Sequence, residues 1–147
     1  MAVPTGSGTE TLHSHCYEDV NAAQNLIVGV QHHVYTVLSV IVYCNGLNAT
    51  TDFGYLRMVG YDNHGGASAQ EHFMARFNIQ VGETFVWNDK FSFNGYEPTG
   101  TAVMSTAAHA TANAAQAGSV AQLFQFSQSH ASDNFDVVIT YIDQDFS

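Results

Sequence analysis

Short runs of alternating apolar and polar residues make up most of the chain, and turn residues separate one run from the next. Successive side chains of a β-strand point to opposite faces, so alternation with a period of two indicates strands. Clusters of Gly, Asn, Asp and Ser between the runs are typical of turns. The pattern predicts strands over residues 10–20, 26–30, 31–44, 53–62, 71–81, 83–95, 120–129 and 134–144.

This succession predicts an all-β fold: an antiparallel β-sandwich or jelly roll of about eight strands, with at most one helix. The segment 83–95 is either one bent strand or two short strands. Residues 96–119 are small, polar and Ala-rich, so we expect a surface insertion there, with one short helix near residues 106–116. Residues 1–9 are expected to form a mobile arm, and residues 10–147 a single β-sandwich domain, because a chain of 147 residues suits one domain.

The run QHHVYTVLSVIVYC at residues 31–44 is largely apolar on both of its faces when it is written as a strand. Its even-numbered positions are predicted to face the core, and its odd-numbered positions, from Tyr35 to Tyr43, to face outward. A strand that is apolar on both faces is buried on both, so we expect another subunit to cover the outward face. The eleven residues from Val34 to Cys44 are too few to cross a membrane, since a helical span needs about 20.

The segment 71–81 alternates more regularly, and only one of its faces is strongly apolar. His72, Met74, Arg76 and Asn78 are predicted to point one way. The opposite side is predicted to form a stripe of core residues: Phe73, Ala75, Phe77, Ile79 and Val81.

The charge composition excludes several classes of partner. The chain has three basic residues against thirteen Asp and Glu, and its formal net charge is −10. Binding to DNA or RNA rests on Lys and Arg that neutralise phosphates, and attraction to an anionic membrane surface rests on the same residues. Neither nucleic acid nor a membrane is therefore expected as a partner. The first ten residues contain no basic start and no apolar core, so no signal peptide is expected and the chain is predicted to be made in the cytoplasm.

The strongest metal-binding pattern is His13-Ser14-His15, because residues two apart in a strand point to the same face, about 7 Å apart. With a third ligand, the two imidazoles could hold zinc or iron, which is similar to cupin-type sites on jelly rolls. A cupin site also needs a nearby Glu and a Gly-rich frame, whereas Glu18 falls on the other face here. We therefore interpret His13 and His15 as surface or interface residues, and we expect neither a metal nor a cofactor.

No residue pattern typical of catalysis occurs in the sequence: there is no G-x-S-x-G elbow, no P-loop and no G-x-G-x-x-G fingerprint. We expect no catalytic residues and a protein that is not an enzyme. The two cysteines, Cys16 and Cys44, are interpreted as buried thiols, while a single disulfide between them stays open.

Four stretches carry a resemblance to a known class of proteins. The succession LIVGVQHHVYTVLSVIVYCNGLN, FGYLRMVGYD, GETFVWNDKFSFNG and DVVITYIDQ resembles small all-β virion proteins of tailed bacteriophages, particularly marine ones. It covers roughly residues 26–144, and residues 96–119 fall outside the shared pattern. The resemblance implies a structural subunit, often trimeric, that decorates or cements a capsid or sits at the neck or tail. It transfers no site residues.

We therefore expect a non-enzymatic virion structural protein, specifically a trimeric capsid decoration or cement protein. Its expected partners are its own copies and the major capsid protein or another virion protein. Aromatic residues are enriched at protein interfaces, and four are predicted to lie near subunit contacts: Tyr35, Tyr43, Tyr55 and Phe85.

Three alternatives stay open. One is a carbohydrate-binding or tail or neck adhesion module that uses Trp87. Another is a subunit of an extracellular filament, in which the N-terminal arm completes a neighbour's sheet. The third and least favoured is a cupin-like metalloprotein.

Overall fold

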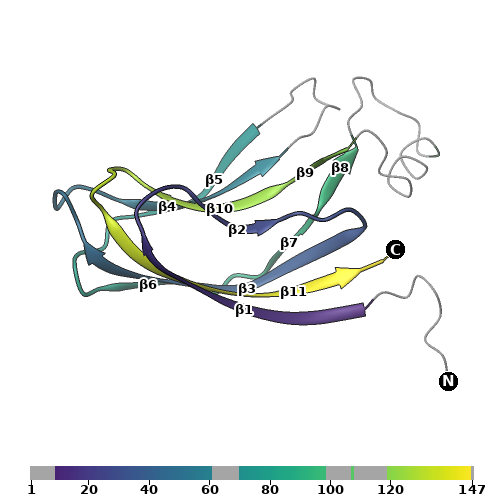
Figure 1. Cartoon of the computed structure of the whole chain (residues 1–147), viewed down its shortest axis with the longest axis horizontal. Helices are drawn as coiled ribbons and strands as arrows, with labels where there is room; N and C mark the ends of the chain where they lie inside the picture. Colours follow the sequence, from purple (N-terminus) through teal and green to yellow (C-terminus); the bar gives the residue numbers. More distant parts are fainter. Residues whose placement is uncertain (1–8, 61–69, 99–106, 108–118, 147) are drawn as a thin grey trace.

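Two antiparallel sheets form the two layers of the computed structural model, which describes residues 9–60, 70–98, 107 and 119–146 (Figure 1). The first sheet contains, in spatial order, β1 (Thr9–Val20), β11 (Asn134–Asp145), β3 (His33–Gly46) and β6 (Thr84–Trp87), and β7 (Phe91–Asn94) also pairs with β3. The second sheet contains β2 (Gln24–Val28), β10 (Leu123–Gln128), β4 (Gly54–Gly60) and β5 (Gln70–Phe77). A short third sheet joins β8 (Tyr96–Pro98) to β9 (Ser119–Ala121).

The pairing of the strands is that of a jelly roll. The first strand pairs with the last, β1 with β11, and the next pair inward is β2 with β10. Then follow β3 with β6 and β7, and finally β4 with β5. These are the strand pairs of one long antiparallel hairpin. Successive pairs along this hairpin lie alternately in the first and the second sheet, so the hairpin is wound into a roll. The prediction of an all-β antiparallel sandwich or jelly roll is therefore confirmed.

The described part of the chain contains eleven strands rather than about eight. The segment 83–95 forms two short strands, β6 and β7, which is one of the two predicted alternatives. The run predicted at 120–129 divides into β9 and β10, because only part of it pairs with the second sheet. The third addition is β8, at the start of the segment predicted to be an insertion.

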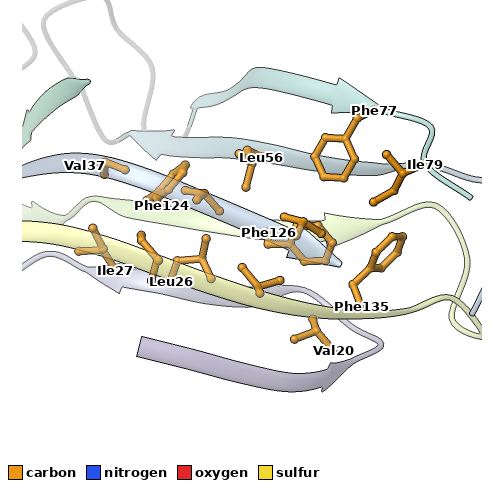
Figure 2. Packing of buried hydrophobic residues seen from close by; sticks show 14 of the residues in the cluster. Val20, Leu26, Ile27, Val37, Leu56, Phe77, Ile79, Phe124, Phe126 and Phe135 are labelled. Carbon is orange, nitrogen blue, oxygen red and sulfur yellow. The ribbon is translucent and has the colours of Figure 1, made fainter. Parts of the chain in front are cut away.

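The core lies between the two layers and takes residues from both (Figure 2). Phe124 and Phe126 from β10 and Phe135 from β11 have no exposed surface. The rings of Phe126 and Phe135 meet edge to face with their centroids 5.3 Å apart, an arrangement that aromatic quadrupoles favour. Burial of each such side chain contributes about 1.5–3 kcal/mol, so these rings are a main attachment between the two sheets.

A β-bulge at Leu38 reverses the side-chain alternation of β3. The pairing of β3 with β11 skips this residue, and one extra residue moves every side chain beyond it to the other face. Before the bulge, Tyr35 is 2% exposed and belongs to the core, whereas after it Ile41 and Tyr43 point outward at 40% and 41%. The prediction that all odd-numbered positions of this strand face outward is therefore wrong for its first half.

A second bulge, at Met74, has the same effect on β5. The pairing of β5 with β4 skips Met74, and Phe73 beyond it is 57% exposed. Val81 lies past the end of the strand and is 60% exposed. The predicted core stripe is therefore wrong at both of these residues, and the bulge brings Phe73 to the same outward side as Arg76.

Two predictions lie largely outside the described residues. Of the arm predicted at residues 1–9, only Thr9 is described, and it begins β1. The segment predicted to be an insertion, 96–119, begins with β8 and ends in β9, while the helix predicted near 106–116 is, apart from residue 107, not within the described ranges. Along the ranges that the structure does describe, there is no helix whose length and apolar character would let it span a membrane.

Candidate functional site

Side chains on the outward side of the first sheet form rows that run across its strands. The register places Cys16 of β1 opposite Val138 of β11, Val138 opposite Ile41 of β3, and Ile41 opposite Val86 of β6. Together they make an apolar row across four strands, in which Val86 is 54% exposed. We call this surface the outer face; it consists of Leu12, Ser14, Cys16, Val34, Thr36, Ser39, Ile41, Tyr43, Val86, Val138, Thr140 and Ile142.

The polar residues of the outer face are hydroxyl-bearing and partly paired with one another. Ser14 Oγ lies 2.9 Å from Thr140 Oγ1 across the β1–β11 pair. Acidic side chains lie at the two ends of the rows: Glu10 pairs with Gln144 at one end, and at the other Asp136 pairs with Tyr43 and Glu18 follows Cys16 along β1. In a chain with a net charge of −10, the outer face itself is uncharged.

The four predicted interface residues do not lie together. Tyr43 is on the outer face, and Tyr55 is on the outward side of the opposite sheet. The prediction for Tyr35 is wrong because its ring is buried inside the subunit. Phe85 is half-buried and packs against the core, and its place at a subunit contact stays a prediction. The Tyr35 hydroxyl accepts a hydrogen bond from a main-chain N–H at 3.0 Å, and the Phe85 ring stacks on Phe77 with 4.1 Å between centroids.

Trp87, the glycan-binding candidate of the carbohydrate-binding alternative, packs against the core from β6. Its indole N–H donates a hydrogen bond of 2.8 Å to the carbonyl oxygen of Asp89, and its ring meets Phe91 edge to face. A half-buried ring whose donor is already used does not offer the flat, exposed platform that the Trp87 hypothesis requires.

His13 and His15 stack with Tyr141 of the neighbouring strand. Their ring centroids lie 5.1 and 5.9 Å from that of Tyr141, and 5.7 Å from each other. Within the described ranges, no group of three or more His, Cys, Asp or Glu is placed to hold a metal ion. Burial raises the pKa of Tyr141 above its ordinary value, and the nearby Tyr17 and Asp143 add to the shift. The two histidines are thus part of an aromatic stack.

The two cysteines lie in different environments, and no disulfide joins them. Cys44 is fully buried, as predicted, and burial is the main cause that raises the pKa of its thiol. Cys16 is exposed on the outer face, so the prediction that both thiols are buried is wrong for Cys16.

A second surface feature, which we call the Arg76 hollow, lies on the outward side of the second sheet. The rings of Phe53 and Tyr55 are 6.0 Å apart, and those of Tyr55 and Phe73 are 5.2 Å apart, so three rings form a row. The Arg76 guanidinium carbon lies 3.5 Å from the centroid of the Phe53 ring. The hollow has a volume of about 510 Å³ and is lined by Phe53, Tyr55, Phe73, Arg76, Gln128 and Ser129.

Two of the three basic residues of the chain, Arg57 and Arg76, lie on this side of the molecule. Arg57 is already engaged: its Nη1 is 3.4 Å from Glu71 Oε1, and its Nε donates to Gln125 Oε1 at 2.8 Å. None of the ion pairs between described residues involves Arg76. This site could not be predicted from the sequence, because strict alternation assigns Phe73 and Arg76 to opposite faces.

Comparison with known proteins adds little. No protein family model matches the chain, and no curated protein matches it. One solved structure, described as "Bacillus endospore appendages form a novel family of disulfide-linked pili", is similar with a TM-score of 0.42 and 9% identity, over 100% of this chain and 97% of that one. A similarity at this TM-score does not bear on function, which is inferred from the geometry of the two outward surfaces instead.

Proposed function

We propose that this protein is a non-enzymatic structural subunit that assembles with copies of itself through the outer face. The observation behind the proposal is the apolar row formed by Cys16, Val138, Ile41 and Val86. Contiguous apolar surface on a soluble monomer is uncommon and marks a contact with a partner. Covering this row removes apolar area from water, which is the main driving force of protein association.

The size of the outer face suits a stable contact. Strands β1 and β11 are each 12 residues long, and four strands lie side by side across the sheet. With a spacing of about 4.8 Å between strands and a rise of about 3.3 Å per residue, such a sheet measures roughly 750 Å². A standard interface buries about 800 Å² on each partner. The outer face is therefore large enough for specific association when nearly all of it is covered.

A second copy of the chain is the occupant that the charges favour. Two subunits of net charge −10 repel each other, so their contact has to avoid placing acidic groups face to face. The outer face meets this condition because Glu10 and Asp136 lie only at the ends of its rows. A strongly charged partner would instead bury charges against a surface that offers them no counter-ion.

The specific assembly that we propose is a trimer that decorates or cements a bacteriophage capsid, in contact with the major capsid protein or another virion protein. It is supported by the resemblance of residues 26–144 to phage virion proteins and by the jelly-roll fold, which viral capsid proteins use. Three subunits can turn their outer faces toward a common threefold axis, so a trimer uses the same surface as a dimer.

Size-exclusion chromatography with light scattering tests the proposal. The wild-type protein is expected at a multiple of 15.9 kDa, threefold for the trimer. Ile41→Lys places a charge in the middle of the apolar row and should give the mass of one chain. Val28→Lys is the matched control, because Val28 is 52% exposed on the second sheet, and it should keep the wild-type mass. A wild-type monomer at millimolar concentration would rule out the proposed assembly.

An extracellular filament is the second candidate, and one observation favours it. Among the described strands, β1 pairs only with β11, and it is exposed along most of its length, so its other edge can accept a strand from a neighbour. In such a filament, deleting residues 1–8 should abolish assembly while Ile41→Lys leaves it intact. The opposite pattern supports association through the outer face.

A further inference from the structure

We infer that the Arg76 hollow binds an acidic saccharide, that is, a sugar chain whose rings carry carboxylates. This site is separate from the outer face, so the inference does not depend on self-assembly. It also differs from the glycan site predicted at Trp87, which packs against the core. Three properties of the hollow define the ligand: its row of rings, its arginine and the polar hollow beside it.

The row of aromatic rings suits the apolar face of a sugar ring. Phe73 is 57% exposed, and the Tyr55 ring meets it edge to face at 5.2 Å between centroids, so one of the two rings at a time can stack on a sugar face. Ligand sites are typically lined by aromatic side chains with a few polar groups that fix the orientation. Tyr55 supplies both, because its ring is apolar and its hydroxyl is polar.

Arg76 supplies the positive charge that selects a carboxylate. A guanidinium donates two parallel hydrogen bonds to a carboxylate, a geometry that a lysine does not reproduce. The stacking of Arg76 on Phe53 at 3.5 Å holds the guanidinium in place before a ligand arrives, which lowers the entropy cost of binding. Arg57 is not equivalent, since its Nη1 is paired with Glu71 and its Nε donates to Gln125.

A second hollow, of about 470 Å³, adjoins the first and shares Phe53 and Arg76 with it. Its remaining lining is polar: Thr50, Thr51 and Asn78. A ligand that lies across both hollows therefore meets aromatic rings on one side of Arg76 and hydroxyl and amide groups on the other. A chain of two or more sugar units has this mixture of apolar ring faces and hydroxyl groups in every unit, whereas an acidic peptide has it only where a tyrosine occurs.

The test is isothermal titration calorimetry of the full chain with tetragalacturonic acid, in calcium-free buffer, with the neutral sugar maltotetraose as comparison. We expect the acidic tetrasaccharide to bind and the neutral one to bind at least tenfold more weakly. Arg76→Gln should lower the affinity about tenfold by removing the charge-assisted pair, and Phe73→Ala should also weaken binding. Higher salt should weaken the wild-type interaction, because the hollow is exposed and its charge is screened.

Lys90→Gln is the matched control. Arg76→Gln and Lys90→Gln change the net charge equally, and Lys90 does not line the hollow. Binding that survives Arg76→Gln, equal binding of both tetrasaccharides, or binding of neither would overturn the inference. A change in the number of subunits per assembly caused by Arg76→Gln would also overturn the inference, because the hollow would then be a contact between subunits.

Discussion

Asp133 is a charged side chain with no exposed surface, and it lies in the loop between β10 and β11. Its Oδ1 accepts a hydrogen bond of 2.9 Å from the main-chain N–H of Asn48. Its Oδ2 accepts bonds from the main-chain N–H of His130 at 3.0 Å and from the Ser129 hydroxyl at 3.3 Å. The carboxylate thus ties two loops together, and one of its partners, Ser129, lines the Arg76 hollow.

Replacing Asp133 with alanine removes all three bonds and leaves their donors without this acceptor. A hydrogen bond to a charged group contributes about 1.5–3 kcal/mol, and a buried donor left unpaired costs about 1–3 kcal/mol. Members of one network are not additive, so we expect a loss of about 4 kcal/mol from a total stability of about 5–15 kcal/mol. For a urea dependence of about 2 kcal/mol per M, the unfolding midpoint should fall by about 2 M.

Urea unfolding, followed by circular dichroism and by Trp87 fluorescence, measures this difference. Asp136→Ala is the control: it removes the same charge, but Asp136 accepts one bond, from the main-chain N–H of Asp19 at 3.0 Å, in an exposed position. The control should lose at most about 1 kcal/mol. An Asp133→Ala midpoint within about 0.5 M of wild type, at an unchanged slope, would show that the carboxylate does not join the loops.

Three further predictions test the fold. In the monomer expected of Ile41→Lys, Ellman's reagent should modify Cys16 and not Cys44, because Cys44 is fully buried and burial raises the pKa of its thiol; adding Cys16→Ser should leave no reactive thiol before unfolding. Gly29→Ala should lower the free energy of unfolding by about 3 kcal/mol in a thermal melt, because the added Cβ would collide with the main-chain oxygen of Gly95. The control Gly46→Ala meets no heavy atom within 4 Å and should lower it by about 1 kcal/mol or less. Burial raises the pKa of Tyr35 above its ordinary value of 10.0, so the folded state holds this proton more tightly. The contribution of Tyr35 to stability should be constant below pH 10 and fall above it, and Tyr35→Phe should reduce that alkaline loss while costing about 1 kcal/mol at pH 7.

The sequence predicted the strands well because long antiparallel strands of a sandwich alternate between core and solvent. The predicted ranges 10–20 and 134–144 agree closely with β1 and β11, which pair along nearly their whole length. Turn residues separated the strands correctly for the same reason, since the chain has to reverse direction between antiparallel neighbours. Pairing of the first strand with the last is a property of the rolled hairpin, which local patterns do not encode.

The faces of two strands were predicted wrongly because β-bulges leave no clear mark in the sequence. Leu38 and Met74 are ordinary strand residues, yet each is skipped in the pairing with its neighbour. The first bulge turns Tyr35 into the core, and the second turns Phe73 to the surface. Alternation therefore identifies a strand reliably, but it assigns a face only as far as the next bulge.

The same limit explains why the Arg76 hollow could not be found from the sequence. Its rings come from β4, β5 and the loop before β4, so their proximity depends on the register between strands. Without the bulge at Met74, the Phe73 side chain would point into the core, away from Arg76. By contrast, the proposal of self-association starts from the sequence itself, because the run at residues 31–44 holds more apolar residues than one face of the core can bury.

The two outward surfaces differ in chemistry, and they belong to different layers of the sandwich. The outer face carries no charge within its rows, whereas the opposite side holds Arg57, Glu71 and Arg76. A subunit that buries its outer face against copies of itself leaves the Arg76 hollow pointing away from that contact. Each subunit then presents one hollow in a fixed position, and several such sites bind a repeating saccharide with greater avidity than one site does. Assembly would thus compensate for the weak binding expected of a single exposed hollow. The outer face would contribute to saccharide binding without touching the ligand, because it holds several hollows in one assembly.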